Sequence, residues 1–254
     1  MSGNSEILGK KIFFLYPSAV VQNRITEELI QQEFEVYTIK DHIRLRKLLK
    51  KYPDSIVFAN IFDGMTEKEW EAWIRGVHAD QATANVKIGI IGPGDDEALK
   101  RKYINDVKIQ CGYTVIKSDL NLAMKQLFDH LKAADAKGRR KYIRAITENE
   151  VNTTVNFPKH GTFVHGAIKD ISVVGFSCFF PDDPDFSKNS LHQDIQIKLQ
   201  TSILKAEGII FGSRMDGNTK IYVVLFTQRI DPEARARIRR YIQSNLQARL
   251  ETEV

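Results

Sequence analysis

The feature that most constrains the fold is a change of pattern near residue 144. Before it, short apolar segments alternate with segments of helical periodicity, and after it strand-forming segments follow one another with turns between them. Alternating strands and helices build a parallel sheet covered by helices, whereas consecutive short strands build a sandwich or a barrel. The 254 residues are enough for two ordinary domains, so the sequence predicts two domains of different fold class.

The first domain, residues 1–135, is predicted to be an α/β doubly wound parallel sheet. Strand-forming apolar segments occupy residues 11–16, 34–39, 55–62, 86–91 and 113–116. Helical periodicity occupies residues 20–32, 42–51, a segment after Thr66, 96–106 and 120–134. We expect Asp41 and Thr66 to be N-caps, with Glu69 completing a capping box at the second of these helices.

The second domain, residues 146–254, is predicted to be a six-stranded antiparallel β-barrel with a terminal helix, joined to the first by a basic hinge at residues 136–145. The strand segments are residues 153–157, 163–168, 173–180, 195–204, 209–214 and 221–226. The segment Asp216-Gly217-Asn218 is a hairpin signal. Asp231 is the expected cap of the last helix, and Pro232 its first residue.

Composition restricts the class of partner. The net charge of +5 is only a mild excess, and the arginines of the last helix lie opposite an apolar stripe, so we expect a solvated face and no nucleic acid. No apolar segment approaches the ~18 residues of a membrane span, so we expect a soluble cytoplasmic protein without membrane insertion. Cys111 and Cys178 fit no metal or redox spacing, which favours buried reduced thiols.

Two short motifs carry the chemistry. Six basic residues and one acid lie between residues 132 and 144, and this run contains Arg140-x-x-x-Arg144. The second motif, Asp170-x-Ser172-x-x-Gly175, begins 26 residues after Arg144. Alone, the first is typical of a solvated linker and the second of an ordinary turn. In this order, before a strand-rich domain, they point to one site.

Together the motifs resemble the PilZ domain, the bacterial receptor for cyclic di-GMP, over about residues 138–247. The resemblance implies that Arg140 and Arg144 grip the ligand, because guanidinium pairs with phosphate and with guanine O6 and N7. It also implies that Asp170 accepts from a guanine N–H edge. Ser172 would donate to phosphate or fix the loop, and Gly175 would permit close backbone approach.

Two neighbouring positions refine this expectation. In the PilZ family, a basic residue just before the first motif arginine is associated with two stacked ligands. Arg139 therefore suggests up to two cyclic di-GMP molecules per chain. Ser177 stands where some members carry another arginine, which implies a weaker grip.

The first domain resembles the receiver domain of bacterial response regulators in its element order and in residues 112–117. A receiver needs an acidic pair after its first strand, but Tyr16, Pro17 and Ser18 stand there. Asn60 follows the third strand, where the phosphoacceptor aspartate is required. We expect a degenerate receiver-like domain that has lost phosphotransfer and makes contacts with a protein partner.

No enzyme constellation is predicted. His160 and His165 are five residues apart on an extended segment, so they lie on opposite faces and do not share a metal. We therefore expect no catalytic residues, cofactor or metal. The expected function is a second-messenger effector that converts cyclic di-GMP binding into a domain rearrangement and partner regulation, in motility or a related behaviour. The alternative is a ligand-independent protein-interaction adaptor of the same architecture.

Overall fold

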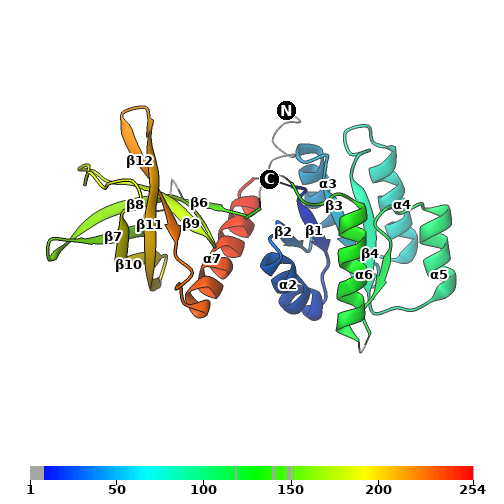
Figure 1. Cartoon of the computed structure of the whole chain (residues 1–254). Coiled ribbons are helices and arrows are strands. Elements are labelled where there is room, and N and C mark those ends of the chain that lie inside the picture. The colour runs from blue at the N-terminus through cyan, green and yellow to red at the C-terminus, as the bar shows by residue number, and fades with distance from the viewer. Residues whose placement is uncertain (1–8, 118, 139–140, 148–149, 151, 254) are drawn as a thin grey trace. The chain divides into compact units, whose positions relative to one another are not determined.

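The computed structural model describes residues 9–117, 119–138, 141–147, 150 and 152–253. The chain divides into two compact units (Figure 1). One comprises residues 1–141 with residues 250–254, and the other comprises residues 142–249. Each unit contains one sheet, of the class predicted for that half of the chain.

The sheet of the first unit has five parallel strands in the order β2-β1-β3-β4-β5. The strands are β1 (Ile12–Leu15), β2 (Val36–Ile39), β3 (Ile56–Ala59), β4 (Lys87–Gly92) and β5 (Tyr113–Val115). This is the order of one of the two common doubly wound folds. Every residue of β1 and β3 is buried, as expected for central strands covered on both faces. The predicted fold class is confirmed.

The first unit also contains helical segments, and two of them begin at the caps that the sequence predicts. The segments are η1 (Val21–Ile25), α2 (Thr26–Gln31), α3 (His42–Lys51), α4 (Glu67–Ala79), α5 (Glu97–Arg101), η2 (Lys102–Asp106) and α6 (Leu120–Ala133). The Asp41 carboxylate accepts from the first amides of α3, and Thr66 and Glu69 form the predicted capping box of α4. The predicted helices at 20–32 and 96–106 each contain a π-helical segment, η1 and η2, which periodicity alone does not reveal.

The sheet of the second unit closes into a six-stranded antiparallel barrel, as predicted. Its strands are β7 (Thr153–Lys159), β8 (Thr162–Ser172), β9 (Gly175–Phe179), β10 (Leu191–Leu199), β11 (Ser202–Asp216) and β12 (Thr219–Phe226). The ring runs β8-β7-β10-β11-β12-β9 and closes because β9 pairs again with β8. A two-residue strand, β6 (Ala145–Ile146), adds to the free side of β8 and was not predicted.

One predicted barrel strand is wrong. Residues 195–204 do not form one strand, because a hairpin turn at Gln200 and Thr201 separates β10 from β11. Gln200 adopts a positive φ of 55°. This conformation is usual for glycine or asparagine, so the turn carries no compositional signal in the sequence.

Aromatic side chains fill the barrel interior, and the last helix covers one end of it. Phe157 lies within 5.7 Å, centroid to centroid, of both Phe180 and Phe186. Helix α7 (Pro232–Glu251) buries Ile238 and Ile242 completely in the same core. The predicted thiols are also confirmed, because the structure describes both cysteines as free and buried.

Candidate functional site

Strand β6 brings the two predicted motifs together. It pairs Ala145 with Ile171 and Ile146 with Asp170, so Arg144, directly before β6, lies diagonal to Asp170. The Nη1 atom of Arg144 lies 3.0 Å from Oδ1 of Asp170. The Arg144 side chain is 47% exposed and that of Asp170 is 18% exposed. The guanidinium is therefore accessible from solvent while one of its N–H groups is held in place.

The other oxygen of the same carboxylate accepts a hydrogen bond from Ser177, which lies opposite Asp170 on β9. Arg144, Asp170 and Ser177 thus form one hydrogen-bonded cluster on the barrel wall, the Arg144 cluster. Ser177 is only 3% exposed. Sequence reasoning missed this role, although the hairpin register determines it. Ser172 pairs with Gly175, so two residues further along each strand Ser177 lies opposite Asp170.

The backbone around Arg144 is anchored on the barrel. Tyr142 and Ile143, immediately before it, are half-buried and pack against the barrel core. Ala145, immediately after it, is completely buried. These contacts fix the position of the Arg144 backbone, so its side chain projects from an anchored segment.

The serine and glycine of the second motif shape the turn between β8 and β9. Ser172 is buried, and its hydroxyl donates to the Gly175 carbonyl at 3.1 Å. A Cβ atom at Gly175 would lie 2.2 Å from the Val224 carbonyl oxygen of β12. Ser172 therefore fixes the turn, and the close backbone approach at Gly175 is made by a neighbouring strand.

The remaining predicted site residues, Arg139 and Arg140, lie outside the described residues. Their neighbours on both sides are placed. The carbonyl of Ala136 accepts from the Lys10 amide at 2.9 Å in the first unit. Ala145 is paired in the barrel of the second unit, so the predicted hinge runs between two anchored points.

The carboxyl end of the first sheet carries an amide and a phenol where a receiver carries acids. Nδ2 of Asn60 donates to the Tyr16 carbonyl at 3.0 Å, and the Phe62 amide donates to Oδ1 of Asn60 at 3.3 Å. The Tyr16 ring packs edge-on against Trp70, with centroids 5.8 Å apart. Tyr16 also covers Gly64, where a Cβ atom would lie 2.6 Å from the ring. Neutral side chains therefore occupy this part of the carboxyl end of the first sheet.

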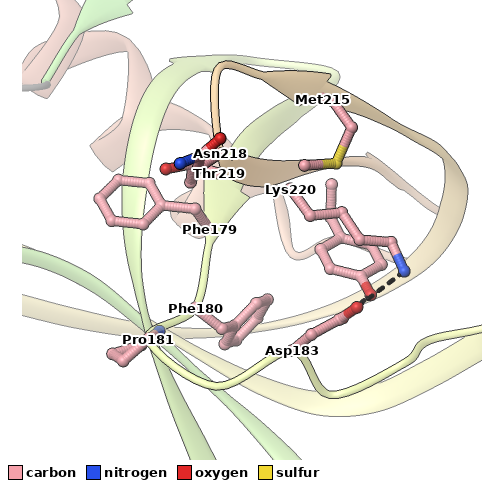
Figure 2. Close-up of a pocket in the computed structure, with 9 residues that line it drawn as sticks. Phe179, Phe180, Pro181, Asp183, Met215, Asn218, Thr219 and Lys220 are labelled. Atoms are coloured by element: carbon pink, nitrogen blue, oxygen red, sulfur yellow. Dashed lines mark hydrogen bonds and ion pairs between the residues drawn. The ribbon is translucent and has the colours of Figure 1, made fainter.

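A separate pocket of about 400 Å³ opens near the β11–β12 hairpin (Figure 2). Its lining residues are Phe179, Phe180, Pro181, Asp183, Met215, Asn218, Thr219, Lys220 and Tyr222. Asp183 accepts hydrogen bonds from Tyr222 and from Lys220, and these bonds hold the pKa of its carboxyl at about 2. None of the predicted site residues that the structure describes lines this pocket.

In the part of the chain that the structure describes, no cluster of three His, Cys, Asp or Glu side chains is arranged to hold a metal ion. No helix there combines the length and apolar character of a membrane span. The described motif residues form the Arg144 cluster and the turn between β8 and β9.

Comparison with known proteins gives a family for the second half. Residues 138–244 match the model of the PilZ domain family. The PilZ domain of Escherichia coli YcgR, solved with c-di-GMP, is 14% identical, with a TM-score of 0.39, over 46% of this chain and 99% of that one. The Bacillus subtilis inhibitor of motility MotI/DgrA is 15% identical, with a TM-score of 0.37, over 46% of this chain and 54% of that one.

For the first half, Vibrio cholerae chemotaxis protein CheY4 is 13% identical, with a TM-score of 0.40, over 50% of this chain and 98% of that one. No curated protein matches the sequence. The match covers about half of the MotI/DgrA chain. Residues 138–244 of this chain are a PilZ domain.

Proposed function

We propose that this chain is a receptor for cyclic di-GMP. The observation that carries the proposal is the 3.0 Å contact between Arg144 and Asp170, which unites the two motifs on the wall of a PilZ domain. A guanidinium can pair with phosphate or fork onto guanine O6 and N7, and a carboxylate accepts from guanine N–H groups. The Arg144–Asp170 ion pair supplies both the guanidinium donor and the carboxylate acceptor.

The ion pair does not prevent ligand binding. An exposed pair contributes about 0–1 kcal/mol, whereas a hydrogen bond between a charged side chain and a ligand contributes about 1.5–3 kcal/mol. Exchanging part of the Arg144–Asp170 contact for contacts with a phosphate or guanine is therefore favourable. Arg140 supplies the second grip, and Arg139 allows a second, stacked ligand.

Ligand binding acts on the connection between the two units. Ala136 is held in the first unit and Ala145 in the second, and the gripping arginines lie between these anchors. A ligand that binds Arg140 and Arg144 restricts the path of this connection, changes the arrangement of the units and alters a partner surface on the first one. Such an effector suits motility control. Small-angle scattering profiles that superpose with and without ligand would contradict this rearrangement.

Calorimetry with cyclic di-GMP tests the binding itself. The native chain is expected to bind with a dissociation constant of about 1 μM or below, and Arg144→Ala to bind roughly 30-fold more weakly, the equivalent of about 2 kcal/mol. Arg237→Ala is the matched control, because Arg237 is an exposed arginine of α7 that pairs with its helix neighbour Glu233 at 2.6 Å. Undetectable binding by the native chain refutes the proposal and favours the ligand-independent adaptor.

A further inference from the structure

The Arg144 cluster lies on an outward-facing part of the barrel that continues across three strands. Tyr222 and Val224 of β12 belong to the core, so Val223 between them faces outward. Val223 pairs with Ser177, and Ser177 pairs with Asp170. Cross-strand partners share a face of the sheet, so these residues form a row along the outer wall.

A bulge in β8 adds a lysine beside this row. The register of β8 against β9 shifts between Ile168 and Asp170, which leaves Lys169 as the extra residue. Bulges re-aim side chains, and they are over-represented next to functional sites. The Lys169 ammonium forms an ion pair with Asp216 at the end of β11. It therefore reaches over the outside of the barrel, since aromatic and aliphatic side chains fill the interior.

The two members of this pair differ in accessibility. The Lys169 side chain is 22% exposed, whereas that of Asp216 is 53% exposed. The ammonium holds the pKa of the Asp216 carboxyl below its usual range, and Arg214, two residues earlier on β11, adds to this effect. A half-exposed carboxylate is readily exchanged for another anion, because water already solvates much of it.

We propose that Lys169 is a phosphate-contacting residue of the cyclic di-GMP site, and that Asp216 is a built-in competitor that occupies its ammonium when ligand is absent. This inference rests on the proposed function. Cyclic di-GMP carries two phosphates. Arg144 pairs with the Asp170 carboxylate, and Lys169 is the bulged residue directly before Asp170 on the same wall. One phosphate pairs with Arg144, and the other displaces Asp216 from Lys169.

Removing each partner of the ion pair has opposite effects on affinity. Lys169→Met is expected to weaken cyclic di-GMP binding roughly tenfold, the loss of one exposed charge-assisted contact. It is also expected to reduce the dependence of binding on salt. Asp216→Asn is expected to tighten binding about threefold or more, because it removes one anion that competes for the Lys169 ammonium. The gain is expected to vanish in Lys169→Met/Asp216→Asn.

The control is a second lysine–aspartate pair of the same domain, Lys220 and Asp183, whose charged atoms lie 2.9 Å apart in the pocket of Figure 2. Asp183→Asn makes the same charge change and is expected to leave affinity unchanged. Native-like affinity of Lys169→Met overturns the proposal. So does a gain from Asp216→Asn that persists without Lys169, which would indicate a long-range field only. Absence of binding by the native chain instead refutes the proposed function, so the two failures are distinguishable.

Discussion

Glu150 links α7 to the barrel by hydrogen bonds, and its removal gives the sharpest stability prediction. Its carboxylate accepts from the Tyr241 hydroxyl at 2.6 Å, from the Thr153 hydroxyl at 2.9 Å and from the Asn245 amide. All three donors are buried, at 7%, 1% and 2% exposure. Glu150→Ala leaves them without this acceptor, although Tyr241 and Thr153 can still pair with each other at 3.1 Å.

The expected cost is about 3 kcal/mol, below the sum for three buried donors because part of the network survives. For a unit of this size, that lowers the melting temperature by about 12 °C or more. Both tryptophans of the chain, Trp70 and Trp73, belong to the first unit, so their fluorescence reports only that unit, while far-UV circular dichroism reports both.

Glu150→Ala should therefore shift a circular-dichroism transition and leave the tryptophan transition in place. Glu150→Gln should lie between native and Glu150→Ala, because an amide oxygen accepts without charge. Glu233→Ala, which removes an exposed glutamate of α7, is the control and should stay within about 0.5 kcal/mol of native. If Glu150→Ala unfolds with the native midpoint, the network does not hold α7 and this reasoning is wrong.

Two further substitutions test the glycine of the turn and the neutral end of the first sheet. Gly175→Ala should destabilise the barrel by about 3 kcal/mol in urea unfolding, because the added Cβ would meet the Val224 carbonyl. Gly212→Ala is the control and should not destabilise the barrel, because nothing lies within 4 Å of a Cβ at that position. Equal stabilities of the two variants would contradict the close contact at Gly175. Asn60→Asp should destabilise the first unit by about 3 kcal/mol at pH 7, because a buried carboxylate replaces the donor to Tyr16. Burial raises the folded-state pKa of the introduced carboxyl, so the loss of stability should shrink as the pH falls below that pKa. If the tryptophan-monitored unfolding midpoint shows no such pH dependence, the introduced carboxyl is not buried and this reasoning is wrong.

Strand and helix positions of the first unit followed from local pattern, because each buried strand is a short apolar run and each of the expected caps Asp41 and Thr66 carries its own signal. The strand boundaries of the barrel were harder to predict from local pattern. The turn at Gln200 uses a residue that does not mark turns, and β6 is too short for any periodicity.

Only the site residues that belong to the two sequence motifs could be predicted. Arg144 and Asp170 were named from the sequence, and the structure places them in contact. Ser177 and Lys169 were not named as site residues, because their positions depend on the hairpin register and on a bulge. Both are properties of strand pairing, which a single strand's composition does not encode.

The carbonyl of Ile146 connects strand β6 to the last helix. It accepts from the Asn245 amide at 3.4 Å and from the Arg249 guanidinium at 3.2 Å, and Ile146 is two residues from Arg144. These donors lie 99 and 103 residues after Ile146 in the sequence, so they are synthesised later than β6. During synthesis, strand β6 therefore lacks these two bonds until residue 249 has emerged and α7 has folded onto the barrel. The backbone beside Arg144 therefore gains its full set of hydrogen bonds only after all the strands of the barrel have been synthesised.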